Sequence, residues 1–370
     1  MKMKPVILIL TSSDVSEYIP KVLKEGIEAS GDYYAVVFDE SHYESKLKYS
    51  SADKLQWLKM KYTKKSENGE SKNESAESKE KRGKFNRIRN AVLRFKPDCI
   101  VCLSPYSHCL ALDSKRKTEF ETPIIALMTT FTADKSFFDL TTDAFIVENE
   151  DAKAEVVRLG IPARSVVALG LPLTVKAITH DEKSELRKQL GIPKSKTVFL
   201  NCRDKKDCTE MFDMLLDQGD IINVIAYCPK SDTFSELRKL VELKSSDNVQ
   251  LFDKKANFDE YLAASDIVIT YYNVSTIYKS FLLGRAVVTF PPKGDMAEKD
   301  LQYLAHRNLI YAAKDSKDII FGLYKLLQTN LADELLRNTS DRKIENNVKS
   351  IAEFVTGFGK QDKTINSEMA

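Results

Sequence analysis

The order of apolar and polar positions along the chain predicts short buried strands that alternate with amphipathic helices. Residues 6–11 form an apolar run, which is usual for a strand buried on both faces. A polar turn and an amphipathic helix follow, up to about residue 30. Further strands are predicted at 34–38, 98–103, 124–128, 144–147, 197–201, 221–227 and 249–252. This alternation predicts an α/β protein with parallel sheets covered by helices.

The pattern is clearest in residues 257–295. An amphipathic turn precedes an apolar run at 267–269, and a polar turn at 273–276 leads into a helix and a second apolar run at 286–290. This succession is a βαβ unit. In parallel sheets, ligands lie at the carboxyl ends of the strands, against helix N-termini that favour phosphate. We therefore expect a ligand at residues 271–276 and 291–295.

Two α/β patterns follow each other along the chain, and 370 residues suffice for about two domains. Glycine and proline residues between the two α/β patterns predict the domain boundaries. We expect a first domain at 1–172, a linker at 173–181, a second domain at 182–340, a C-terminal helix at 341–358 and a polar tail at 359–370.

One segment of the first domain differs from the rest. Residues 63–82 are rich in Ser, Glu and Lys and almost free of apolar side chains, so we expect a disordered charged insertion. The preceding residues, 47–62, place Trp57 and Lys59 among other apolar and basic side chains. This segment is suited to an anionic membrane surface. The alternative is a helix that packs on the first domain.

The net charge and the cysteine content limit the classes of partner and metal site that the sequence supports. The net charge is +2 from 56 basic and 54 acidic residues, so nothing in the balance favours nucleic acid, and none is expected as a partner. Cys99 and Cys102 form a C-x-x-C pair, but inside a strand they point to opposite faces. We expect buried free thiols there, no metal, and a cytoplasmic protein. The first apolar run is too short for a secretory signal, and no apolar run is long enough to span a bilayer.

Residues 127–173 and 186–200 carry a resemblance to a known family. They resemble the GT-B glycosyltransferases, in particular the monogalactosyl- and glucosyl-diacylglycerol synthases of family twenty-eight, which are related to MurG. The resemblance implies two Rossmann-like domains that face each other across a cleft, with a C-terminal helix that crosses back. It implies a UDP-sugar substrate on the C-terminal domain, no further cofactor, and a lipid acceptor such as diacylglycerol on the N-terminal domain. It also implies a peripheral position on the inner face of the cell membrane.

The chain departs from that family at positions that carry its chemistry. The Gly-rich turn that ends in Gly-His reads Ser12-Ser13-Asp14, and the acceptor-side aspartate is replaced by Thr130. The donor-site Pro-Gly-Gly reads Tyr272-Asn273-Val274, and the ribose-binding glutamate is replaced by Lys279. The Pro-Gly-Gln-Glu loop reads Pro292-Lys293-Gly294-Asp295.

Glycosyl transfer needs a base near the acceptor hydroxyl and a group that stabilises the departing diphosphate. Asp14 lies where a base is needed, although it is also suited to cap the first helix. The candidate donor-binding residues are Arg203, Asn273, Ser275, Thr276, Lys279, Gly294 and Asp295. Helix capping, a solvated cluster of Arg203 with its neighbouring lysines, and an exposed helix lysine at 279 are the alternatives. Trp57, Lys59 and Thr130 are the candidates for the acceptor and membrane side.

These features support three functional hypotheses. The first is a hexosyltransferase that transfers sugar from a UDP-sugar to a membrane lipid such as diacylglycerol. The second is an inactive GT-B paralogue that binds a nucleotide sugar, a lipid or a protein. The third is transfer of glycerol phosphate from CDP-glycerol, because residues 264–290 are also similar to glycerophosphotransferases of the same architecture.

Overall fold

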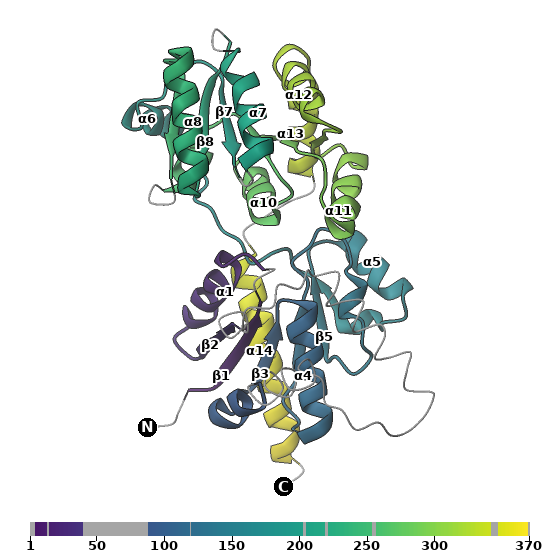
Figure 1. Cartoon of the computed structure of the whole chain (residues 1–370). Helices are drawn as coiled ribbons and strands as arrows, with labels where there is room; N and C mark the ends of the chain where they lie inside the picture. The colour runs from purple at the N-terminus through teal and green to yellow at the C-terminus, as the bar shows by residue number, and fades with distance from the viewer. Residues whose placement is uncertain are drawn as a thin grey trace, which may run out of the picture. The chain divides into compact units, whose positions relative to one another are not determined.

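The structure is a computed structural model that describes residues 4–12, 15–39, 88–118, 120–202, 205–218, 221–253, 257–341 and 347–368. The chain divides into two compact units (Figure 1). The first comprises Met1–Leu173 and Asn346–Ala370, and the second comprises Thr174–Glu345. The predicted disordered insertion at 63–82 and the segment with Trp57 and Lys59 lie outside the described residues.

The first unit contains a parallel sheet of six strands in the order β2-β1-β3-β4-β5-β6. Its strands are β1 (Val6–Thr11), β2 (Tyr34–Asp39), β3 (Cys99–Cys102), β4 (Ile124–Leu127), β5 (Ala144–Val147) and β6 (Val166–Ala168). Its helices are α1 (Tyr18–Glu28), α4 (Pro105–Thr118), α5 (Glu150–Arg158) and α14 (Val348–Glu368), with a helical stretch at 88–95 and 3-10 turns η3 (Lys135–Phe137) and η4 (Ala163–Ser165). The strands predicted in this unit are confirmed, and β6 is an addition.

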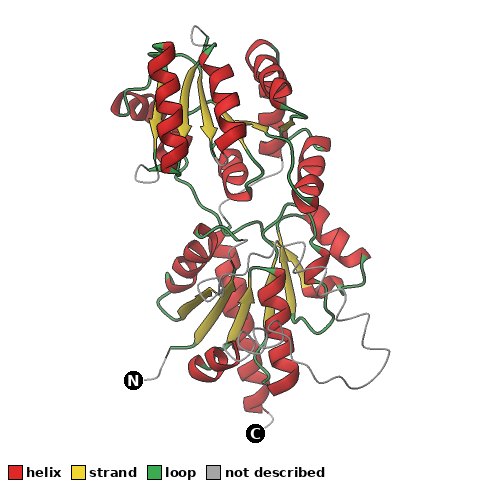
Figure 2. Cartoon of the chain, in the orientation of Figure 1, coloured by secondary structure: helices red, strands yellow, loops and turns green. Residues whose placement is uncertain are grey.

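Helices cover both faces of this sheet, which is why its strands are apolar throughout (Figure 2). One face packs Leu8, Leu10 and Ile100 against α4 and the helical stretch at 88–95. The Cys99 and Cys102 side chains are fully buried free thiols, as predicted. Burial raises the pKa of the Cys99 thiol, which suits an inert core residue.

The C-terminal helix α14 belongs to the first unit and packs against α1 and β3 (Figure 1). The two helices approach so closely that a Cβ on Gly26 would lie 2.4 Å from Cγ1 of Val348. The Tyr33 hydroxyl donates to the Thr356 carbonyl at 2.8 Å. The return of the last helix to the first domain, implied by the family resemblance, is therefore confirmed.

The ends of α14 differ from the sequence prediction. The helix begins at Val348 rather than 341, and it runs to Glu368, through most of the expected tail. The sequence of residues 360–368 lacks the apolar periodicity of an amphipathic helix, which is why it predicts a polar tail. These residues also lack glycine and proline, so nothing in them ends a helix that is already formed.

The second unit also contains a parallel sheet of six strands, in the order β12-β11-β10-β7-β8-β9. Its strands are β7 (Thr197–Asn201), β8 (Asn223–Tyr227), β9 (Val249–Phe252), β10 (Ile267–Thr270), β11 (Ala286–Thr289) and β12 (Tyr311–Ala312). Its helices are α6 (His180–Gln189), α7 (Lys205–Leu216), α8 (Ser231–Lys244), α9 (Phe258–Ala264), α10 (Val274–Leu282), α11 (Asp295–His306), α12 (Ser316–Gln328) and α13 (Leu331–Asp341).

The βαβ unit predicted in residues 257–295 is confirmed as β10, α10 and β11, and its two strands pair in parallel register from Ile267 opposite Ala286.

The first helix of the second compact unit, α6, starts earlier than the sequence predicts. Thr179 and Glu182 form a capping box, in which each side chain accepts from the backbone amide of the other. Helix α6 therefore begins at His180, inside the predicted linker.

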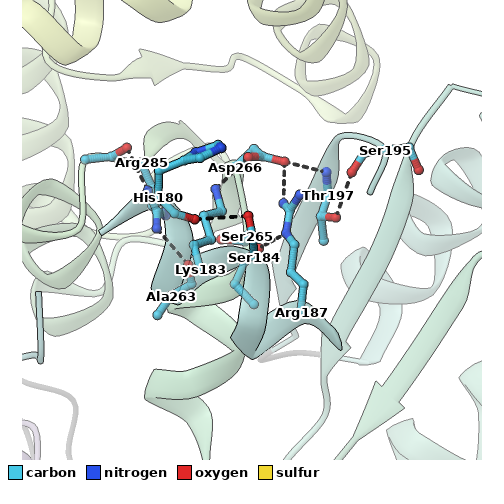
Figure 3. Close-up of polar contacts among 12 residues, drawn as sticks. His180, Lys183, Ser184, Arg187, Ser195, Thr197, Ala263, Ser265, Asp266 and Arg285 are labelled. Carbon is cyan, nitrogen blue, oxygen red and sulfur yellow. Dashed lines mark hydrogen bonds and ion pairs between the residues drawn. The ribbon is translucent and has the colours of Figure 1, made fainter. Parts of the chain in front are cut away.

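The amino edge of the second sheet is held by one carboxylate, Asp266, directly before β10 (Figure 3). Its Oδ1 accepts from Lys183 Nζ at 2.6 Å. Its Oδ2 accepts from Arg187 Nη2 at 2.6 Å and from the Thr197 amide at 2.9 Å. Asp266 thereby ties α6 to the first residues of β7 and β10.

Two arginines around this carboxylate also cap helix α9. Arg187 Nε donates to the Ala264 carbonyl, and Arg285 Nη2 donates to the Ala263 carbonyl, both at 2.7 Å. These are among the last carbonyls of α9, which have no partner within the helix. Arg187 thus binds both the carboxylate and the negative end of a helix dipole, and Arg285 binds the helix end.

The charges of this cluster determine its ionisation. Burial alone would raise the pKa of Asp266, but the hydrogen bonds and charges of Lys183 and Arg187 outweigh it, and the pKa lies at about 2. Burial and the charge of Arg285 lower the pKa of Lys183 to about 8. Asp266 is therefore charged over the whole physiological range.

We expect Asp266→Asn to lower the free energy of unfolding at pH 7 by about 3 kcal/mol, because it leaves buried cations without their carboxylate. The pKa of Asp266 lies below its ordinary value of 3.8, so its stabilisation is present above pH 4 and is lost as the pH falls towards 2. The measurement is urea denaturation of both proteins between pH 7 and pH 3. The difference in free energy of unfolding between the two proteins should be smaller at pH 3 than at pH 7.

A matched control is Glu185→Gln on the same helix, where the ion pair with Lys188 is exposed. This change should alter the free energy of unfolding by less than about 0.5 kcal/mol. Equal unfolding midpoints for Asp266→Asn and the unmodified protein at pH 7 would contradict the structural role of the cluster.

Candidate functional site

The carboxyl ends of the strands in the second sheet meet at one edge because all its strands are parallel. Helix α10 begins at this edge, three residues after the end of β10. The Asn273 side chain caps it: Oδ1 accepts from the Thr276 amide at 2.9 Å. The capping interpretation of Asn273 is confirmed, and any contact of its side chain with a ligand remains a proposal.

Asn201, the last residue of β7, connects this turn to the sheet. Its Nδ2 donates to Thr270 Oγ1 at 3.1 Å and to Thr276 Oγ1 at 3.3 Å. One amide thus joins the ends of two neighbouring strands to the first turn of α10. The sequence analysis missed this residue. A polar residue that ends an apolar strand at the ligand-binding edge was the available signal.

Two hydroxyl groups at the same edge are buried without a hydrogen-bond partner among the described residues. The first is Ser275 Oγ in the first turn of α10, in a residue that is 9% exposed. The second is Thr289 Oγ1 at the end of β11, in a fully buried residue. A buried polar group that lacks a partner costs free energy.

Lys279 does not have the exposed position that the sequence analysis offered as its alternative. It is 5% exposed, and its Nζ contacts both Asp259 oxygens, at 2.7 and 2.9 Å. Burial lowers its pKa, and Asp259 opposes that shift. The amphipathic pattern could not show this, because α10 is buried along most of its length.

The predicted loop before α11 lies at the same edge. Gly294 precedes the helix with φ +106°, a conformation that side chains rarely adopt, and Asp295 is its first residue. Both are exposed. Next to them, Lys293 Nζ lies 5.6 Å from the Tyr271 ring centre, and Tyr271 stacks on Phe290 with 4.0 Å between ring centres.

In the first unit, Thr130 is half-buried at the carboxyl end of β4, and its Oγ1 donates to the Thr132 carbonyl at 2.7 Å. At the carboxyl end of β1, Thr11 Oγ1 and Ser12 Oγ are buried and have no partner within the described part of the chain. The first unit therefore also has unpaired hydroxyl groups where its parallel strands end.

The catalytic candidate Asp14 and the donor candidate Arg203 lie outside the described residues. The N-cap position of α1 is Glu17. The role of Asp14 as a base remains a proposal. His108 is a buried core residue: its Nε2 lies 2.8 Å from Thr142 Oγ1, and burial lowers its pKa to about 4.

Solved structures share this architecture. MurG from Acinetobacter baumannii superposes with a TM-score of 0.64 at 10% identity, covering 95% of this chain and 99% of that one. The S. aureus MnaA–UDP structure superposes with a TM-score of 0.63 at 11% identity, covering 96% and 97%. Together with the two parallel six-stranded sheets, these similarities define a GT-B fold.

The sequence comparisons are more specific. Residues 13–173 match the family model of monogalactosyldiacylglycerol (MGDG) synthase. A processive diacylglycerol beta-glucosyltransferase from Staphylococcus haemolyticus (strain JCSC1435) is 24% identical over 190 residues, which cover 50% of this chain and 48% of that protein. The chain thus matches about half the length of this curated relative. The predicted resemblance to the diacylglycerol glycosyltransferase group is confirmed.

We expect Asn273→Ala to lower the free energy of unfolding by about 1 kcal/mol, because the first turn of α10 loses its capping acceptor. Asn273→Asp keeps an acceptor oxygen and should retain most of that stability. Urea denaturation of the three proteins measures the effect. If the Asn273→Ala protein is as stable as the unmodified protein, the capping hydrogen bond does not contribute to the free energy of unfolding.

Proposed function

We propose that the protein transfers a hexose from a UDP-sugar to diacylglycerol at a membrane surface. The observation that carries the proposal is the first turn of α10, where the helix N-terminus and the unpaired Ser275 hydroxyl lie together at the carboxyl edge of a parallel sheet. The family match at 13–173 and the relatives named diacylglycerol glucosyltransferases support the choice of reaction and acceptor.

The turn has the chemistry that a diphosphate needs. The N-terminus of α10 carries partial positive charge from its aligned peptide dipoles. Ser275 and Thr276 add hydroxyl groups, and Asn201 holds Thr276 in place. We assign this turn to the departing diphosphate of the donor. We assign Arg203, after β7, and the exposed Gly294 and Asp295, before α11, to the rest of the donor.

On the acceptor side, we assign Asp14 as the base. It follows β1, and a carboxylate there can take the proton of the acceptor hydroxyl as that oxygen forms the new bond to the sugar. The bond from the sugar to the diphosphate breaks, and the leaving group carries the negative charge to the α10 turn. Thr130, at the end of β4, is assigned to the acceptor's polar head.

The decisive test is Ser275→Ala. Removing an unpaired buried hydroxyl should not lower the stability of the unliganded protein, but it should weaken UDP binding roughly tenfold through the loss of one hydrogen bond to a charged group. Isothermal titration calorimetry measures the affinity, and transfer from UDP-glucose to diacylglycerol in lipid vesicles measures activity. Ser235→Ala in α8, whose hydroxyl bonds within its own helix, is the control.

The outcomes separate the three functional hypotheses. UDP binding with sugar transfer supports the proposal, whereas UDP binding without transfer supports the binding module. Stronger binding of CDP-glycerol than of UDP supports the glycerophosphotransferase. Unchanged UDP affinity in Ser275→Ala means that the donor lies elsewhere.

Membrane attachment is proposed for the segment with Trp57 and Lys59. No helix among the described residues is both long enough and apolar enough to cross a bilayer. The double variant Trp57→Ala, Lys59→Gln should sediment less with vesicles that contain anionic phospholipid, by about fivefold for the lysine alone. The control is Lys349→Gln, an exposed lysine in α14. Equal sedimentation of the double variant would exclude this segment as the membrane contact.

A further inference from the structure

The ion pair between Asp259 and Lys279 joins the first turn of α9 to the middle of α10. Its two partners differ in exposure: the Lys279 side chain is 6% exposed and the Asp259 side chain 31%. The lysine is therefore enclosed, whereas the Asp259 side chain stays partly accessible to solvent.

The position of Asp259 places its carboxylate at the ligand-binding edge. Helix α9 follows β9 and precedes β10, so its first turn lies at the carboxyl edge of the sheet, where α10 also begins. The neighbouring Phe258 fixes that turn: its ring packs edge-on against Tyr227 and Phe199, with ring centres 4.9 and 5.1 Å apart. Asp259 thus belongs to a rigid part of the site.

Lys279 orients the Asp259 carboxylate but leaves some of its hydrogen-bond acceptor positions available. Lys279 Nζ contacts Oδ1 and Oδ2 together, and among the described residues these are the hydrogen bonds that Asp259 accepts. A carboxylate has about four acceptor positions, so those that point away from Lys279 remain available. Two such oxygens match a pair of adjacent hydroxyl groups, each of which donates one hydrogen bond.

We propose that Asp259 accepts the hydroxyl groups of the nucleotide's ribose, and that Lys279 is its positioning residue. This inference rests on the proposed function. In the family that the chain resembles, a glutamate at the position of Lys279 holds the ribose. Here α10 supplies a lysine instead, and the carboxylate comes from the adjacent helix α9. The reversed charge at 279 is then an exchange of roles rather than a loss of the ribose contact.

The test compares UDP with 2′,3′-dideoxy-UDP, which lacks both ribose hydroxyls, by calorimetry on the full chain. The unmodified protein should bind UDP about tenfold or more tightly than the dideoxy compound. Asp259→Asn should bind the two with nearly equal affinity while its affinity for dideoxy-UDP stays unchanged. Asp232→Asn, an exposed first-turn aspartate of α8, is the matched control and should keep the preference for UDP.

Two further variants protect the test from a folding defect, because Asp259→Asn leaves Lys279 buried without its partner. Asp259→Asn with Lys279→Met removes both charges and should also lose the preference for UDP. Asp259→Lys with Lys279→Glu moves the carboxylate back to α10 and should restore the preference. A merely structural ion pair would leave the ratio of the two affinities unchanged in all of these variants. Circular dichroism confirms that each is folded.

The failures can be told apart. If neither nucleotide binds the unmodified protein, the proposed function fails together with this inference. If both bind equally well, a nucleotide site exists but Asp259 does not contact ribose. If Asp259→Asn and the double variant without charges keep the preference for UDP, the ribose contact belongs to another residue.

Discussion

The parallel arrangement of strands is the constraint on which both units depend. A parallel sheet needs a crossover helix between consecutive strands, so helices cover both faces and the strands are buried throughout. All carboxyl ends then meet at one edge, together with the N-termini of the following helices. This geometry places Asn201, Thr270 and Thr276 together, although β7 and β10 are far apart in sequence.

The two edges of the second sheet use polar groups differently. At the amino edge, Asp266 accepts from two cations and a backbone amide, and the surrounding arginines cap α9. Those contacts are internal and stabilise the unit. At the carboxyl edge, the buried hydroxyls of Ser275 and Thr289 have no partner in the described segments. A folded chain tolerates such groups where their partners come from a ligand, since the cost of leaving them unpaired is recovered on binding.

In the second unit, the positions at which the chain departs from the family motifs lie at this carboxyl edge or close to it. Helix N-termini bind phosphate through backbone N–H groups, so under the proposed function the replacement of Pro-Gly-Gly by Tyr272-Asn273-Val274 would keep the backbone contribution to binding as long as α10 starts at the same point. Asn273 ensures that start by capping the helix. At position 279 the charge is opposite to that of the glutamate in the family. The role of Lys279 therefore has to be judged together with its ion-pair partner, Asp259. Side-chain identity at one position is therefore a poor guide to the site unless its partners are known.

The sequence alone predicted the strands, the βαβ unit at 257–295, the division into two α/β units and the edge at which a ligand is expected, because apolar periodicity and turn residues are local signals. The GT-B fold was implied by the family resemblance of residues 127–173 and 186–200. The sequence did not reveal that Lys279 is buried, that Asn201 joins two strands to α10, or that α14 extends to Glu368. Each of these depends on residues distant in sequence or on the absence of a helix-breaking residue. Only tertiary structure brings Asp259 and Lys279 together, since ion pairs form between neighbours in space, and periodicity along a chain contains no record of them.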